Sequence, residues 1–171
     1  MMESHAALSA LSTSAIVYNQ KKEYQKALLT DRRVLELEKK LYPPGHPLHQ
    51  NICNSLYNLA QDYGRTGDQE TKRKLLEEAL HERHIHFGKN DPKSFLTLLS
   101  LVRAYAAAGE YDKGKAACGE ALEILRLYPD FAAVKKAEAE ELQSHMARFA
   151  GSEKSPGRGS GKSLFGKLFG R

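Results

Sequence analysis

The apolar positions of the chain repeat three times along residues 1–127. Each repeat contains a tyrosine with a leucine seven residues before it and another leucine seventeen residues after it. Beyond each tyrosine, apolar residues recur at the three- and four-residue spacing of a helix face. This pattern predicts, in each repeat, a helix that ends near the tyrosine, a short turn and a second helix. The three sets are Leu11, Tyr18 and Leu35; Leu56, Tyr63 and Leu80; and Leu98, Tyr105 and Leu122.

The residues at the predicted turns support this division. Gly67 and Gly109 stand four residues after their tyrosines, where the end of a helix favours a left-handed residue. The first repeat has Lys22 at the same position and is the weaker match. Between repeats, His46-Pro47 and Asp91-Pro92 mark linkers, and Asp followed by Pro is a good start for a helix.

The repeats resemble a known family. Residues 56–63 (Leu-Tyr-Asn-Leu-Ala-Gln-Asp-Tyr), the later Ala79-Leu80 and the linker at 88–92 are similar to the long tetratricopeptide repeats (TPR) of kinesin light chains. The resemblance covers residues 7–127 and implies an all-α, right-handed α-solenoid of three TPR-type helix pairs. Three residues depart from the family pattern. Lys72 and Gly114 replace a small alanine, and Asp31 replaces a large apolar residue.

Residues 130–149 form the pattern of a solitary amphipathic helix. Its apolar side contains Phe131, Val134, Ala137, Leu142, Met146 and Phe149. A stack of repeats exposes an apolar end, and this helix is suited to cover it. The sequence thus predicts a TPR domain over residues 1–150, with a capping helix at 130–149, and a flexible basic tail rich in Gly and Ser at 151–171.

The charge of the chain is concentrated in that tail. The formal net charge is +5, but residues 151–171 contain five basic residues and one acidic residue, which leaves the body near neutral. We therefore expect no nucleic-acid binding. Two cysteines form no disulfide framework, and the chain has no apolar run long enough to span a membrane and no secretory signal pattern. These features predict a cytoplasmic protein.

The tail itself ends in a Leu-Phe motif with basic residues around it. If helical, it would place its apolar residues on one side, which suits an anionic membrane surface, a partner or the protein's own groove. The segment at 157–163 is similar to a phosphate-binding loop, but Pro156 stands where that loop needs its first glycine. The motif residues are Lys162, Leu164, Phe165, Lys167, Leu168 and Phe169.

No residue pattern predicts catalysis, a metal or a cofactor. His81 and His84 are three residues apart instead of the four of a zinc-protease helix, so this segment is interpreted as a solvated helix end. The remaining histidines, among them His49, are scattered in the sequence. Cys53 and Cys118 fall on predicted helices and are expected to be buried free thiols. The chain is therefore expected not to be an enzyme.

The resemblance implies that the first helices of the repeats line a concave groove for an extended peptide. Asn58 matches the family asparagine that hydrogen-bonds the peptide backbone, and Arg65 and Arg103 favour an acidic partner. Leu99 is expected to be exposed on the same face. The predicted function is a non-catalytic adaptor or assembly factor, and the alternative is a peripheral membrane module docked on anionic lipid by its tail. The predicted peptide-binding residues are Asn54, Tyr57, Asn58, Gln61, Arg65, Ser100 and Arg103.

Overall fold

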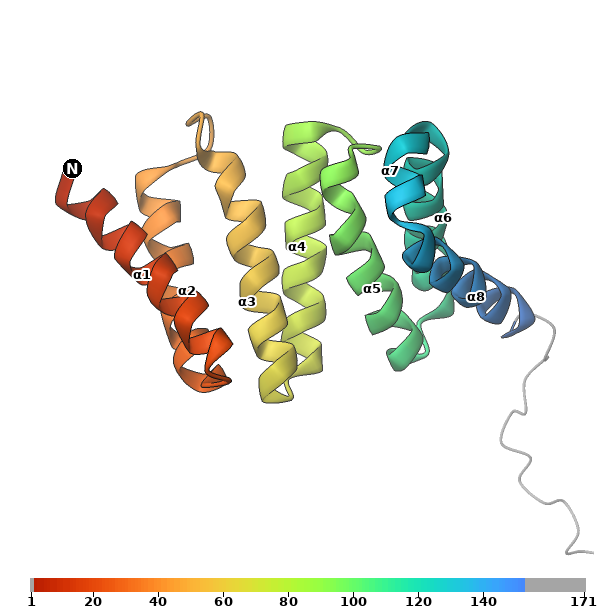
Figure 1. Cartoon of the computed structure of the whole chain (residues 1–171), viewed down its shortest axis with the longest axis horizontal. Helices are drawn as coiled ribbons and strands as arrows, with labels where there is room; N and C mark the ends of the chain where they lie inside the picture. Colours follow the sequence, from red (N-terminus) through yellow and green to blue (C-terminus); the bar gives the residue numbers. More distant parts are fainter. Residues whose placement is uncertain (1, 153–171) are drawn as a thin grey trace, which may run out of the picture.

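The computed structural model describes residues 2–152, and within this range it contains only helices and their connections. Figure 1 shows the helices following one another along the long axis of the molecule. The α-helices are α1 (Met2–Gln20), α2 (Tyr24–Leu41), α3 (Ile52–Thr66), α4 (Gln69–Phe87), α5 (Phe95–Ala108), α6 (Tyr111–Leu127), α7 (Pro129–Val134) and α8 (Lys136–Ser152). Two short 3-10 helices, η1 (His49–Asn51) and η2 (Pro92–Ser94), precede α3 and α5.

The predicted all-α solenoid of three helix pairs is confirmed. The pairs are α1 with α2, α3 with α4, and α5 with α6, and each pair also packs against the next. Their turns have the backbone that the sequence predicts, with Gly67 at φ 99° and Gly109 at φ 74°. Lys22 occupies the equivalent place in the first pair and has φ 60°, so it takes the left-handed conformation that glycine takes in the other two.

Three of the six repeated leucines, Leu35, Leu56 and Leu98, lie in the buried core, and the other three are partly buried. Leu56 and Leu98 are fully buried, together with Leu76 and Ala79 of α4 and Ala121 of α6. These positions recur at helical spacing on facing helices, so apolar side chains interlock along the stack. Cys53 and Cys118 are free and buried, as predicted.

The C-terminal cap differs from the single helix predicted for residues 130–149. The helix is broken at Lys135, where φ is −100° and ψ is 29°, and the two parts are α7 and α8. The break turns Val134 outward, with 79% of its surface exposed, so its predicted place on the apolar side is wrong. Leu142 and Phe149 of α8 are buried against the third pair. The missing side chain of Gly114 leaves room there for the Phe149 ring, because a Cβ atom on Gly114 would lie 2.7 Å from Phe149 Cζ.

The helix α8 runs to Ser152, two residues past the domain boundary predicted at 150. The tail motif at 162–169 and the loop-like segment at 157–163 lie outside the described residues, so their roles stay predictions. Among the helices of residues 2–152, none combines the length and the apolar character needed to cross a membrane.

Candidate peptide-binding surface

A cavity of about 560 Å³ lies between the first helices of the first two pairs. Helices α1 and α3 form its walls, and α2 contributes Asp31 and Val34. Four predicted peptide-binding residues line it from α3, namely Tyr57, Asn58, Gln61 and Arg65. This cavity lies on the surface where the sequence predicts a peptide groove.

The polar side chains of this cavity differ in how many hydrogen bonds they already make within the protein. Arg65 donates from Nη1 to Asn19 Oδ1 at 3.0 Å and to Asp62 Oδ1 at 2.8 Å, so its charge is partly neutralised within the chain. Asn58 is exposed, and its amide makes no side-chain hydrogen bond within residues 2–152. Gln61 Nε2 is buried without a hydrogen-bond partner among the described residues. The Asn58 amide is therefore available to a peptide backbone, and Gln61 lines the same cavity with an amide nitrogen that lacks a partner among the described residues.

Carboxyl groups lie beneath this surface, between α2 and α3. Asp31 and Asp62 are both buried, and their side chains interact with each other. Burial and the neighbouring Asp62 carboxylate raise the pKa of Asp31 to about 7. Burial also raises the pKa of Glu38, against the opposing effect of a hydrogen bond from Ser55. The floor of the groove is thus acidic, and the extent of its charge depends on pH.

Asn54 lines a different cavity, of about 300 Å³, near the N-terminal end of α3. The other lining residues come from η1, α4 and η2 and are Gln50, Asn51, Arg83, Phe87 and Lys93. Lys93 Nζ lies 3.8 Å from the centre of the Phe87 ring, a cation–π contact that holds the ammonium at the edge of the cavity. The second cavity therefore has two cations and several amides on its wall.

Arg83 is the residue of this cavity that sequence reasoning missed. It is 8% exposed, and its Nη2 donates to Asn54 Oδ1 at 2.8 Å, while its Nε is buried without a partner among the described residues. It forms no ion pair with a carboxylate within residues 2–152, and burial lowers its pKa. A signal existed in the sequence, because Leu76, Ala79 and Arg83 share one helical face. The segment around Arg83 had instead been interpreted as a solvated helix end.

The third pair contributes less to the groove than predicted. Leu99 is 2% exposed and Ser100 is 7% exposed, so the expectation of exposed positions there is wrong for both. Ser100 Oγ lies 3.5 Å from Tyr57 Oη, which joins α5 to α3. Arg103 donates to both carboxylate oxygens of Glu141 on α8, at 2.6 and 2.7 Å. The cap thus occupies the part of α5 that was expected to meet a peptide.

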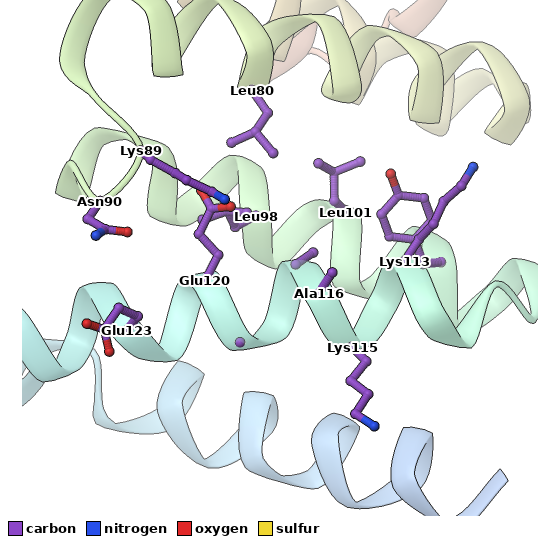
Figure 2. A pocket seen from close by; sticks show the side chains of 13 residues that line it. Leu80, Lys89, Asn90, Leu98, Leu101, Lys113, Lys115, Ala116, Glu120 and Glu123 are labelled. Carbon is purple, nitrogen blue, oxygen red and sulfur yellow. The ribbon is translucent and has the colours of Figure 1, made fainter. Parts of the chain in front are cut away.

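A further cavity, of about 660 Å³, lies between α4 and α6, the second helices of two pairs. Figure 2 shows Leu80, Leu98 and Leu101 on its apolar side and Lys89 and Lys113 near its rim, while Lys115 points away toward α8. It contains none of the predicted peptide-binding residues. We therefore assign the candidate binding surface to α3 and its two cavities.

Residues 52–93, which include α3 and α4, match the tetratricopeptide repeat family. No curated protein matches the chain in sequence. The fold is similar to that of the kinesin light chain with nearly identical TPR-like repeats from Podosopora anserina, at 17% identity and a TM-score of 0.61, over 88% of this chain and 77% of that one. It is also similar to BtubC (BKLC) from P. vanneervenii, at 16% identity and a TM-score of 0.63, over 96% of this chain and 70% of that one.

These similarities confirm the predicted TPR repeats and their likeness to kinesin light chain repeats. The fold is that of a protein–protein interaction module, and such repeats generally bind protein partners. TPR families are generally scaffolds without catalytic activity.

Proposed function

We propose that this protein is a non-catalytic adaptor or assembly factor that binds an extended peptide segment of a partner along α3. Asn54, Asn58, Gln61 and Arg65 follow one another at i, i+4, i+7 and i+11, so they form one stripe on the helix. The stripe connects the cavity at Arg83 with the groove between α1 and α3. An extended peptide needs such a continuous row of hydrogen-bonding groups, because its own backbone groups are unpaired.

The observation that carries the proposal is the buried guanidinium of Arg83. A buried cation without a carboxylate partner is costly, and an acidic group from a ligand would relieve that cost. Lys93 adds a second positive charge at the same cavity. The partner's acidic residue therefore belongs at Arg83 and Lys93, and not at Arg65 and Arg103, whose guanidinium groups already meet Asp62 and Glu141.

The other end of the peptide meets a surface of different character. Asn58 and Gln61 offer amides for its backbone, while Asp31 and the underlying carboxyl groups disfavour a second acidic side chain in the groove. The proposed ligand is thus an extended segment with an acidic residue at one end and neutral or basic residues toward the other. This polarity also fixes the direction in which the peptide lies along α3.

A random peptide library selected on the purified full-length protein tests the proposal. We expect enriched peptides to share an acidic residue at one end, and their affinity to fall with rising salt. Asn58→Ala and Lys93→Gln should each weaken binding about tenfold, the loss of one hydrogen bond or one charged contact. Lys89→Gln, an exposed lysine outside both cavities of α3, is the matched control and should leave affinity unchanged.

Peptides that bind equally well to the wild type, to Asn58→Ala and to Lys93→Gln would refute the proposal. Arg83→Gln is informative in a second way. Because Arg83→Gln removes a buried cation, it should not lower the thermal midpoint. A variant that stays folded and no longer binds acidic peptides would show that Arg83 contacts the acidic residue of the peptide.

The alternative function, docking on anionic lipid, depends on residues 162–169, and its support is the sequence alone. Vesicle sedimentation with the full-length chain and with a variant truncated after Ser152 separates the two proposals. Lipid binding that is lost on truncation, with peptide binding retained, would assign the two activities to different parts of the chain.

A further inference from the structure

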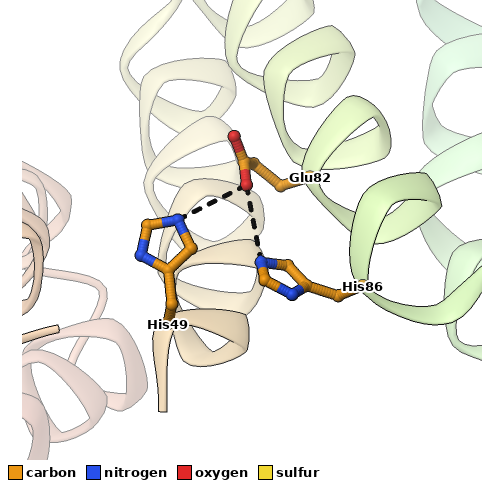
Figure 3. A group of neighbouring side chains, drawn as sticks. All are labelled: His49, Glu82 and His86. Atoms are coloured by element: carbon orange, nitrogen blue, oxygen red, sulfur yellow. Dashed lines mark ion pairs between the residues drawn. The ribbon is translucent and has the colours of Figure 1, made fainter. Parts of the chain in front are cut away.

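Three side chains with metal-binding atoms converge at the junction of the first and second helix pairs. Glu82 and His86 lie one turn apart on α4, and His49 reaches them from η1 (Figure 3). Glu82 Oε2 lies 3.6 Å from His49 Nε2 and 3.7 Å from His86 Nε2. The ligand atoms of all three lie within 4.8 Å of one another. The sequence had left His49 among the scattered histidines, because 33 residues separate it from Glu82 in the chain.

These distances suit a shared tetrahedral metal ion. Zinc binds histidine nitrogen and carboxylate oxygen at about 2.0–2.2 Å, which places neighbouring ligand atoms of a tetrahedron about 3.4 Å apart. The separations of 3.6 and 3.7 Å are close to that value and are longer than an ordinary N–H···O hydrogen bond. The three groups thus point at a common space without hydrogen-bonding one another.

The orientation of His49 is already fixed in the form that a ligand needs. Its Nδ1 lies 2.6 Å from the backbone oxygen of Tyr42, and since a carbonyl only accepts, Nδ1 is the donor. In the neutral ring this leaves the lone pair on Nε2, the atom that faces Glu82. Metal-binding histidines commonly donate their second nitrogen to a backbone carbonyl in this way.

The site is sheltered and still within reach of solvent. The exposed fractions of the side chains are 13% for His49, 25% for Glu82 and 24% for His86. The other histidines of the same helix are placed differently, since His84 pairs with Glu120 of α6 and His81 is exposed. His81 and His84, the pair that the sequence offered for comparison with zinc proteases, therefore do not face a common ion.

We propose that His49, Glu82 and His86 form a zinc-binding site, with water as the fourth ligand. Two imidazoles and one carboxylate in a tetrahedral arrangement suit zinc better than calcium or magnesium, which prefer oxygen ligands alone. The ion would join the linker after α2 to α4 and so clamp the first helix pair onto the second. It would act beside the peptide surface and does not depend on it, because none of its ligands lines either cavity of α3.

Zinc titration of the chelator-treated full-length protein, followed by calorimetry, is the direct test. We expect one equivalent of zinc with micromolar or tighter affinity, and at least a tenfold loss for each of His49→Ala, Glu82→Gln and His86→Ala. His81→Ala is the matched control on the same helix and should bind zinc as wild type does. At zinc concentrations about a hundred times the Kd, the thermal midpoint of the wild type should rise by about 5–10 °C.

Cobalt substitution adds a readout of geometry. Cobalt in a four-coordinate site absorbs strongly in the visible range, and this absorption should appear in the wild type and in His81→Ala but not in the three ligand variants. Circular dichroism of the metal-free variants verifies that each is folded. The proposal would be overturned if the wild type bound no zinc at a zinc concentration of about 100 μM. It would also be overturned if the three ligand substitutions left zinc binding unchanged. Neither result bears on peptide binding, which is measured without metal.

Discussion

The carboxyl group of Asp31 on α2 meets that of Asp62 on α3, in the buried layer between the first two helix pairs. Asp62 is fully buried and Asp31 is 7% exposed. Asp62 Oδ1 accepts from Arg65, whereas its Oδ2 lacks a partner in the described structure. Two acidic groups in one apolar layer with one arginine cannot both ionise at low cost.

This pair predicts a stability that falls as pH rises. The pKa of Asp31 goes from 3.8 in a free side chain to about 7 in the folded protein. Below about pH 4 both states hold this proton, and the contribution of the Asp31–Asp62 pair to stability is greatest. Between about pH 4 and 7 the unfolded chain loses the proton first, so the free energy of unfolding falls, and above about pH 7 it levels off. Thermal unfolding followed by circular dichroism across this range measures the trend.

Asp31→Asn should remove most of this dependence. The introduced amide can donate to Asp62 Oδ2, which has no partner among the described residues. We therefore expect the free energy of unfolding to rise by about 1–3 kcal/mol at pH 8 and to stay unchanged at pH 4. Glu36→Gln removes an exposed carboxyl from the same helix and is the matched control, with little change at either pH. Parallel pH profiles for wild type and Asp31→Asn would contradict the prediction.

The sequence predicted the features that depend on neighbours in the chain. Helix pairs follow from apolar spacing, and the left-handed turns follow from Gly67 and Gly109, because both are decided within one or two helical turns. Asn58 and Gln61 were identified through the resemblance to the TPR family, and both line the cavity between α1 and α3.

Features that depend on contacts between distant segments were missed. The bond from Arg83 to Asn54 and the clamp of Arg103 by Glu141 join residues 29 and 38 positions apart. The convergence of His49 with His86 is of the same kind. The break at Lys135 was missed for another reason: α7 and α8 each pack on the third pair, and this packing overrides the continuous amphipathic pattern of residues 130–149.

Lys22→Gly should stabilise the protein. Lys22 holds φ at 60°, a conformation that costs a residue with a side chain about 1–2 kcal/mol and costs glycine little. After the larger entropy loss of glycine is subtracted, we expect a gain of about 0.5–1 kcal/mol in the free energy of unfolding, or about 1–4 °C in the thermal midpoint. Lys21→Gly, next to it but without positive φ, should give no gain. Equal effects of the two substitutions would show that φ is not the cause.

Gly109→Ala tests the same turn position in the opposite direction. Gly109 has φ 74° and open space around its Cα, so a methyl group there meets no neighbour and the cost is one of backbone conformation alone. We expect a loss of about 1 kcal/mol in the free energy of unfolding measured in urea. A neutral result would mean that the turn can rearrange without cost.

The packing of Phe149 against Gly114 predicts a strongly non-additive pair of substitutions. Gly114→Ala brings a Cβ within 2.7 Å of Phe149 Cζ and should destabilise by about 1–3 kcal/mol through overpacking. Phe149→Ala should lower the free energy of unfolding by about 3–5 kcal/mol, because it leaves a cavity. In the double variant the added methyl group no longer clashes, so the combined loss should be smaller than the sum by 1 kcal/mol or more, on the order of measured couplings. Urea unfolding of the four proteins gives this coupling, and additive losses would contradict the contact.

The thiol of Cys118 offers a probe of the same cap. It is fully buried, and its Sγ donates to the Leu142 backbone oxygen at 3.0 Å, so α8 lies directly over it. Burial raises the pKa of Cys118 to about 11, which leaves about one thiolate in a thousand at pH 8.

In a Cys53→Ala background, a disulfide reagent such as dithionitrobenzoate should therefore label the native protein slowly and the urea-unfolded protein at once. Phe149→Ala should speed native labelling at least tenfold, because it loosens α8 over the thiol, whereas Val134→Ala, an exposed residue of α7, should not. Fast labelling of Cys118 in the Cys53→Ala protein would mean that α8 readily separates from α6 in solution. It would contradict the prediction that α8 packs stably on the third helix pair.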